Sequence, residues 1–88
     1  MEIIIDGNLI TNKQELFSNL KLQINSDEFY GNNLDALWDV LSSINEELIV
    51  EIKNLNTLKL NLGEYTDSLV QLFMDLKEEK SDCIIKII

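Results

Sequence analysis

The chain has 88 residues, 45% of them hydrophobic, and a formal net charge of −9 at pH 7. This length allows one small hydrophobic core, so we expect a single domain over residues 1–88. No apolar run approaches the roughly 18 residues of a membrane span, and the N-terminus lacks the basic and long hydrophobic regions of a signal peptide. The acidity also disfavours nucleic acid and anionic membranes, so we expect a cytoplasmic protein that binds neither membrane nor nucleic acid.

A strand and a helix are predicted first along the chain. Residues 2–6 (EIIID) are branched and apolar, as in a β-strand, and the turn cluster DGN closes them. Thr11 and Gln14 have capping-box spacing, which makes Thr11 the expected N-cap of a helix over about 12–24. The core face of that helix comprises Leu16, Phe17, Leu20 and Ile24.

The segment from Phe29 to Leu41, FYGNNLDALWDVL, predicts a loop followed by a helix. Asn32 or Asn33 fits the N-cap, because a short side-chain acceptor satisfies a free backbone N–H of the first turn. At ~100° per residue, the predicted core stripe lies within roughly 60° of Leu34, with the tryptophan at its border. Its members are Leu34, Leu37, Trp38 and Leu41.

Two aspartates lie outside this stripe. Asp35 stabilises the helix, since an anion in the first turn faces the positive end of the helix dipole. Asp39 lies four residues from this like charge, an arrangement that costs about 0.2–0.5 kcal/mol. Such a cost is compatible with a functional site, although an ordinary solvated acidic face is the commoner explanation for two aspartates on a helix.

The rest of the chain predicts two strands and two further segments. Residues 48–52 (LIVEI) and 84–88 are expected strands, and residues 66–80 an amphipathic helix. In residues 56–62 the alternating leucines are compatible with a strand as well as a helix. Strands separated by helices imply a small parallel sheet, and strands this apolar are expected to be covered on both faces or to be central.

The acidic residues are concentrated in one third of the chain. No basic residue occurs between Lys21 and Lys53, whereas this stretch has seven acidic residues; nine acidic and seven basic residues make up the rest. The stretch therefore contributes −7 of the net −9. A field of this kind attracts basic partners, and solubility alone explains the segregation less well.

Catalytic and metal-binding functions have little support. The chain has no histidine and one cysteine, Cys83, which we interpret as a small buried hydrophobe and not a reactive thiol. Asp35 and Asp39 could offer oxygen ligands to a metal, but two acids on one helix make a weak site. We therefore expect no enzyme, no metal and no cofactor.

The stretch YGNNLDALWDVL closely resembles the YGxNLDALWDxL segment of the barstar family, inhibitors of secreted guanyl-specific bacterial ribonucleases. Length, segment order and acidity also fit the family. The resemblance implies an α/β fold with a small three-stranded parallel sheet packed with about four helices. It also favours a short helix over residues 56–62, ended by Gly63.

The resemblance implies inhibition by occlusion of a small basic, barnase-like ribonuclease. In that mechanism Asp39 takes the place of substrate phosphate, and Asp35 contacts basic residues at the mouth of the active site. Gly31 lets the backbone approach the enzyme closely. The other implied contacts are Phe29, Asn33, Leu34, Trp38 and Asp75, and we expect the free inhibitor to be a monomer.

Two implied contacts have an alternative interpretation. Tyr30 fits either a lid over the core, which we favour slightly, or a partner contact. Asp75 fits either an acidic contact or a solvent-facing helical residue.

The chain departs from the family pattern at four positions. Phe29 replaces tyrosine and Asp75 replaces glutamate, which removes a hydroxyl and shortens a carboxylate. Ile44 replaces an aromatic residue, and Leu48 replaces a proline. These changes keep a second function open, in which the same scaffold neutralises a different basic toxin as an immunity protein.

Overall fold

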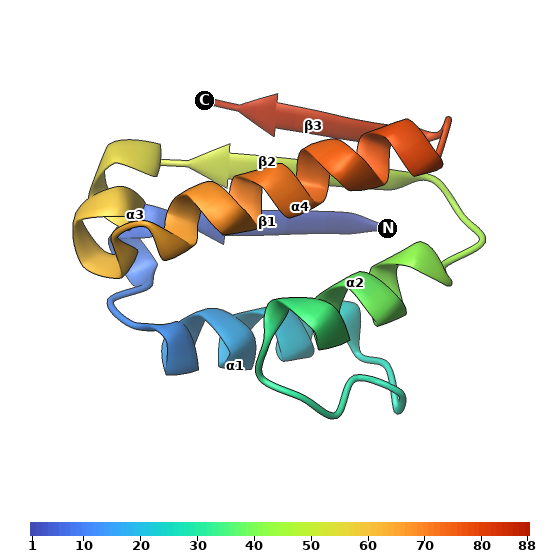
Figure 1. The fold of residues 1–88 in the computed structure, drawn as a ribbon, viewed down its shortest axis with the longest axis horizontal. Coiled ribbons are helices and arrows are strands. Elements are labelled where there is room, and N and C mark those ends of the chain that lie inside the picture. Colours follow the sequence, from blue (N-terminus) through green and yellow to red (C-terminus); the bar gives the residue numbers. More distant parts are fainter.

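The computed structural model describes residues 1–88 and has three strands, four α-helices and a short 3-10 helix (Figure 1). In chain order they are β1 (Glu2–Asp6), η1 (Gly7–Leu9), α1 (Lys13–Ile24), α2 (Leu34–Ser42), β2 (Leu48–Lys53), α3 (Leu55–Leu62), α4 (Tyr65–Glu79) and β3 (Cys83–Ile87). The predicted fold class is confirmed, and predicted boundaries shift by at most about one residue. No helix combines the length and apolarity that crossing a membrane requires.

The three strands form one parallel sheet with β2 in the centre. Ile3, Val50 and Ile85 lie side by side across it, on the face that packs against the helices. The adjacent residues on the outer strands, Ile4 after Ile3 and Ile84 before Ile85, point the other way and are each 42% exposed.

The expectation that these apolar strands are covered on both faces is therefore wrong for β1 and β3. Contacts join α1 to β1, α4 to β3 and α2 to α4, so these helices form one layer on one face of the sheet (Figure 1). The fourth α-helix, α3, contacts η1 and α4, so none of the helices in the structure packs on the opposite face. Only β2, between its two neighbours, is central as expected.

The cap of α1 also differs from the prediction. The N-cap is Asn12, whose side-chain oxygen accepts the Glu15 N–H at 2.8 Å. Thr11 precedes the cap and is bonded through both its N–H and its hydroxyl to the Glu15 carboxylate. The helix therefore starts one residue later than it would with Thr11 as its N-cap. Asparagine is a stronger N-cap than threonine, and the Glu15 side chain, three residues after Asn12, can reach back to the residues before the helix.

Candidate partner-binding surface

The helix α2 starts at a defined cap. The side-chain oxygen of Asn33 accepts the Ala36 N–H at 2.8 Å, so Asn33 and not Asn32 is the N-cap. Gly31 precedes this cap with no positive φ. A Cβ at Gly31 would lie 3.0 Å from the Ala36 side chain and 3.1 Å from Asn33 Nδ2, so the glycine permits close packing against the start of α2.

The core face of α2 is rotated from the predicted stripe. The buried side chains are Leu37, Val40 and Leu41. At about 100° per residue their mean direction lies roughly 65° from Leu34. Leu34 and Trp38 consequently lie on the flank of the helix, half-buried against the core. Their positions leave apolar surface available beside the core.

The same rotation directs Asp35 and Asp39 away from the core. Both are exposed. The three ion pairs of the structure join the N-terminus to Glu46, Lys59 to Asp67 and Lys80 to Asp82, so neither aspartate of α2 has a cationic partner. Two uncompensated carboxylates on one helical face form a local negative potential suited to a cation.

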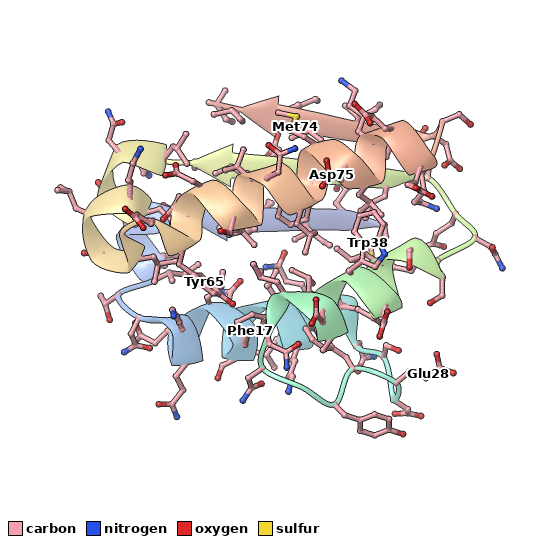
Figure 2. All side chains as sticks on the ribbon, in the orientation of Figure 1. Phe17, Glu28, Trp38, Tyr65, Met74 and Asp75 are labelled. Atoms are coloured by element: carbon pink, nitrogen blue, oxygen red, sulfur yellow. The ribbon has the colours of Figure 1, made fainter.

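A groove of about 330 Å³ lies between α2 and α4. Figure 2 shows Trp38 reaching from α2 toward α4, where Asp75 lies. The groove thus combines an aromatic ring with carboxylates from two helices. Its lining residues are Leu34, Asp35, Trp38, Ser68, Gln71, Leu72 and Asp75.

Asp39 does not line this groove, although it is on the same helix. Asp75 lines it from α4, and its Oδ1 accepts a 2.9 Å hydrogen bond from Gln71 Nε2. Asp75 has no ion pair. The structure thus brings Asp75 to the same surface as Asp35, without a cation to neutralise either.

The loop before α2 separates its two aromatic residues. Phe29 is 6% exposed and meets Phe17 edge to face, with ring centroids 6.4 Å apart. Tyr30 is 83% exposed. Phe29 therefore lies in the core and offers no ring for stacking on a partner, and Tyr30 is not a lid over the core.

Lys21 of α1 contacts this loop in two ways. Its Nζ donates to the Tyr30 carbonyl at 3.3 Å and lies 5.2 Å from the centroid of the Phe29 ring. A lysine in this position combines a cation–π contact with a hydrogen bond. It restrains the backbone of the loop while the Tyr30 side chain remains in solvent.

Besides the core residue Leu72, the groove contains two polar residues, Ser68 and Gln71, that were not among the site residues predicted from sequence. They precede Asp75 by seven and four positions, so all three share one face of α4. That spacing was the available signal. It identifies a shared helical face, but only the packing of α2 on α4 shows that this face borders Trp38.

The remaining chemically notable positions lie elsewhere. Cys83 is a free, buried thiol, and burial raises its pKa, with lesser effects of opposite sign from Lys80 and Asp82. The Ile44 carbonyl accepts from Lys80 Nζ at 2.5 Å, and Leu48 is buried at the start of β2. No three acidic, cysteine or histidine side chains lie together as metal ligands.

Two comparisons with known proteins agree with this architecture. A family model described as "Barstar (barnase inhibitor)" matches residues 1–87. The chain is also 35% identical over 82 residues to a Bacillus subtilis (strain 168) protein named "Putative ribonuclease inhibitor YrdF", a match that covers 92% of this chain and 90% of that protein. Since the family match spans nearly all of the fold described above, the chain belongs to the barstar family.

Proposed function

We propose that this protein is an inhibitor, not an enzyme, and that it blocks a small basic ribonuclease by inserting α2 and the preceding loop into the active site. The observation that carries this function is a set of three carboxylates without ion pairs: Asp35 and Asp75 line the groove with Trp38, and Asp39 is exposed on the same helix as Asp35. Membership of the barstar family and the name of the Bacillus relative support the ribonuclease as target.

Asp39 is the candidate for the phosphate mimic. It is exposed, has no intramolecular ion pair and lies in the part of the chain without lysine between Lys21 and Lys53. A ribonuclease site that binds RNA phosphate presents cationic donors, and charge-assisted hydrogen bonds to a carboxylate are the strong kind. Asp35 and Asp75 would contact cations beside that site, on either side of the groove.

The groove adds an apolar contact to this charge pattern. Trp38 and Leu34 are half-buried at its wall, so much of their surface is already ordered by core packing. An ordered aromatic side chain loses little conformational entropy on binding. Interfaces obtain much of their binding energy from such residues next to desolvated charge pairs.

A titration of enzyme activity tests the proposal. The purified protein is added to a barnase-like, guanyl-specific ribonuclease beside the variants Asp39→Ala and Asp67→Ala. We expect stoichiometric inhibition by the wild type and at least about tenfold weaker inhibition by Asp39→Ala, since one hydrogen bond to a charged group contributes about 1.5–3 kcal/mol. Asp67, paired with Lys59 at the start of α4, is the control and should be neutral.

Equal inhibition by Asp39→Ala and wild type would contradict the role of Asp39. No inhibition by folded wild-type protein would favour the second candidate, an immunity protein against a different basic toxin. The burial of Phe29 is the observation in favour of that candidate, because it removes one expected aromatic contact from the surface. Titration against basic nucleases of other families then distinguishes the targets.

A further inference from the structure

The sheet has two outer edges, and a side chain closes one of them. In the middle of β1, the Ile4 N–H donates to Gln23 Oε1 at 2.7 Å, and Gln23 Nε2 donates back to the Ile4 carbonyl at 2.8 Å. Gln23 belongs to α1, which packs against β1. The outward peptide groups at the centre of this edge are therefore satisfied within the molecule.

The outer edge of β3 has no such closure. The Leu48 N–H donates to the Asp82 carbonyl at 3.1 Å, and the Ile88 N–H donates to the Ile52 carbonyl at 2.9 Å. These bonds fix which residues of β3 face β2, and the peptide groups of Ile85 and Ile87 point outward. Figure 1 shows no helix or strand beyond this side of β3.

The β3 edge is also apolar. Ile84, Ile87 and Ile88 are 42%, 44% and 69% exposed, and Met74 of α4, which Figure 2 places beside β3, is 38% exposed. Edge strands in monomers are commonly blunted by charges, proline or a bulge. Within Cys83–Ile87 the only charged residue is Lys86, and there is no proline.

Charge is balanced at this edge, unlike in the rest of the molecule. Residues 77–88 contain three lysines and three acidic residues, a net charge of zero, within a chain of −9. A second copy can therefore approach β3 without the repulsion that it would meet near α2. Opposite charges also occur at positions that a two-fold axis can bring together.

We infer that β3 pairs antiparallel with β3 of a second copy of this chain, about a two-fold axis at Ile84. This register places Lys86 of each copy opposite Asp82 of the other, in two equivalent pairs that stabilise the contact. An axis at Lys86 would oppose the two lysines, and an axis at Ile85 would place each lysine opposite Ile84. The charge pattern thus selects the register centred on Ile84.

In this dimer, the Ile85 N–H of each copy donates to the Cys83 carbonyl of the other, while the Cys83 N–H keeps its 3.3 Å bond to the Lys80 carbonyl. The two Ile84 side chains cover each other. The acidic surface of α2 lies away from β3 (Figure 1), so the dimer leaves it accessible. The inference is independent of the proposed ribonuclease target. It differs from the expectation of a monomeric free protein, and the oligomeric state in solution distinguishes the two.

Sedimentation equilibrium over a range of protein concentrations tests the dimer, with variants that reverse the proposed charge pairs. Lys86→Glu alone and Asp82→Lys alone should each weaken dimerisation by about tenfold, because two cross-strand attractions become repulsions. The double variant should restore the wild-type dissociation constant. Lys77→Glu makes the same charge change on α4 and should leave it unaltered. A monomer at every concentration, or singles that behave like wild type, would overturn the inference.

Cross-linking tests the register. In a Cys83→Ala background, Ile84→Cys places two thiols on the axis at a cross-strand distance compatible with a disulfide, so oxidation should give a covalent dimer. Lys86→Cys is the matched control, and it should not cross-link because it faces Asp82 of the second copy. Rapid cross-linking through position 86 and not 84 would overturn the proposed axis.

Discussion

At the scale of single residues, Phe29 and Tyr30 show how adjacent aromatic side chains acquire different roles. Phe29 packs on Phe17, whereas Tyr30 projects from a backbone that Lys21 restrains. We predict that Phe29→Ala destabilises the fold by about 3–5 kcal/mol, as for other buried phenylalanines. Its effect on inhibition should follow from the loss of folded protein, which urea denaturation measures.

Tyr30→Ala should give the opposite result. Its ring is 83% exposed, so unfolding free energy should remain nearly constant. If the ring stacks on the ribonuclease, affinity should fall about two- to tenfold, from about 0.5–1.5 kcal/mol for an aromatic pair. A binding titration beside denaturation separates the two residues. Unchanged affinity for Tyr30→Ala would remove this ring from the proposed interface.

Sequence alone did not distinguish these two residues. Periodicity assigns faces in helices and strands, but Phe29 and Tyr30 lie in a loop without a regular repeat. Their environments depend on Phe17 and Lys21, which α1 brings to them from earlier in the chain. The position of Asp39 on α2, in contrast, followed directly from the helical pattern.

At the scale of elements, the start of α1 has a measurable pH dependence. Hydrogen bonds from the Thr11 hydroxyl and then from its N–H lower the pKa of Glu15 below its ordinary value of 4.5. As pH falls, the Glu15 carboxylate is therefore protonated at a higher pH in the unfolded chain than in the folded protein. The stabilisation is complete above about pH 4.5 and is lost as pH drops through the lower folded-state pKa.

We predict that Glu15→Gln flattens the decline in unfolding free energy as pH falls below about 4.5, while Asn12→Ala leaves that pH dependence in place. Asn12→Ala should instead cost about 1 kcal/mol at neutral pH through loss of the N-cap. Urea denaturation across this pH range measures both effects. An equally steep acid decline in Glu15→Gln would contradict the proposed role of the Thr11 bonds.

The hydrophobic patterns predicted where the helices begin and end better than they predicted which face of each helix is buried. The stripe of α2 was predicted from its leucines and Trp38, whereas the buried face also includes Val40 and leaves Leu34 and Trp38 half-buried at its flank. In α3 the leucine alternation is uninformative, because Leu58 is buried and Leu60 is 85% exposed. Such faces depend on neighbouring elements, and no local pattern contains that information.

At the scale of the whole molecule, a single layer of helices determines what the protein exposes. EIIID has the composition of a strand covered on both faces, yet Ile4 is exposed because the three-stranded sheet is covered on one side only. Sequence patterning predicted the parallel topology through the order of strands and helices. It did not predict on how many faces the helices would pack.

The distribution of charge over the molecule leads to a prediction about association with the proposed ribonuclease. Seven net negative charges lie between Lys21 and Lys53, and Asp35 and Asp39 have no ion pairs within the molecule. Electrostatic attraction should therefore increase the rate at which this protein and a basic ribonuclease associate. This attraction should weaken as the Debye length shortens from ~30 Å at 0.01 M salt to ~3 Å at 1 M.

We predict that the association rate constant, measured by stopped-flow fluorescence of Trp38, falls steeply with salt in the wild type. The double variant Asp35→Asn and Asp39→Asn should reduce that slope, because it removes charge from the helix that enters the active site. Glu78→Gln with Glu79→Gln removes the same charge at the far end of α4 and should have a smaller effect. Equal slopes for the two double variants would mean that net charge, and not the surface of α2, directs the encounter.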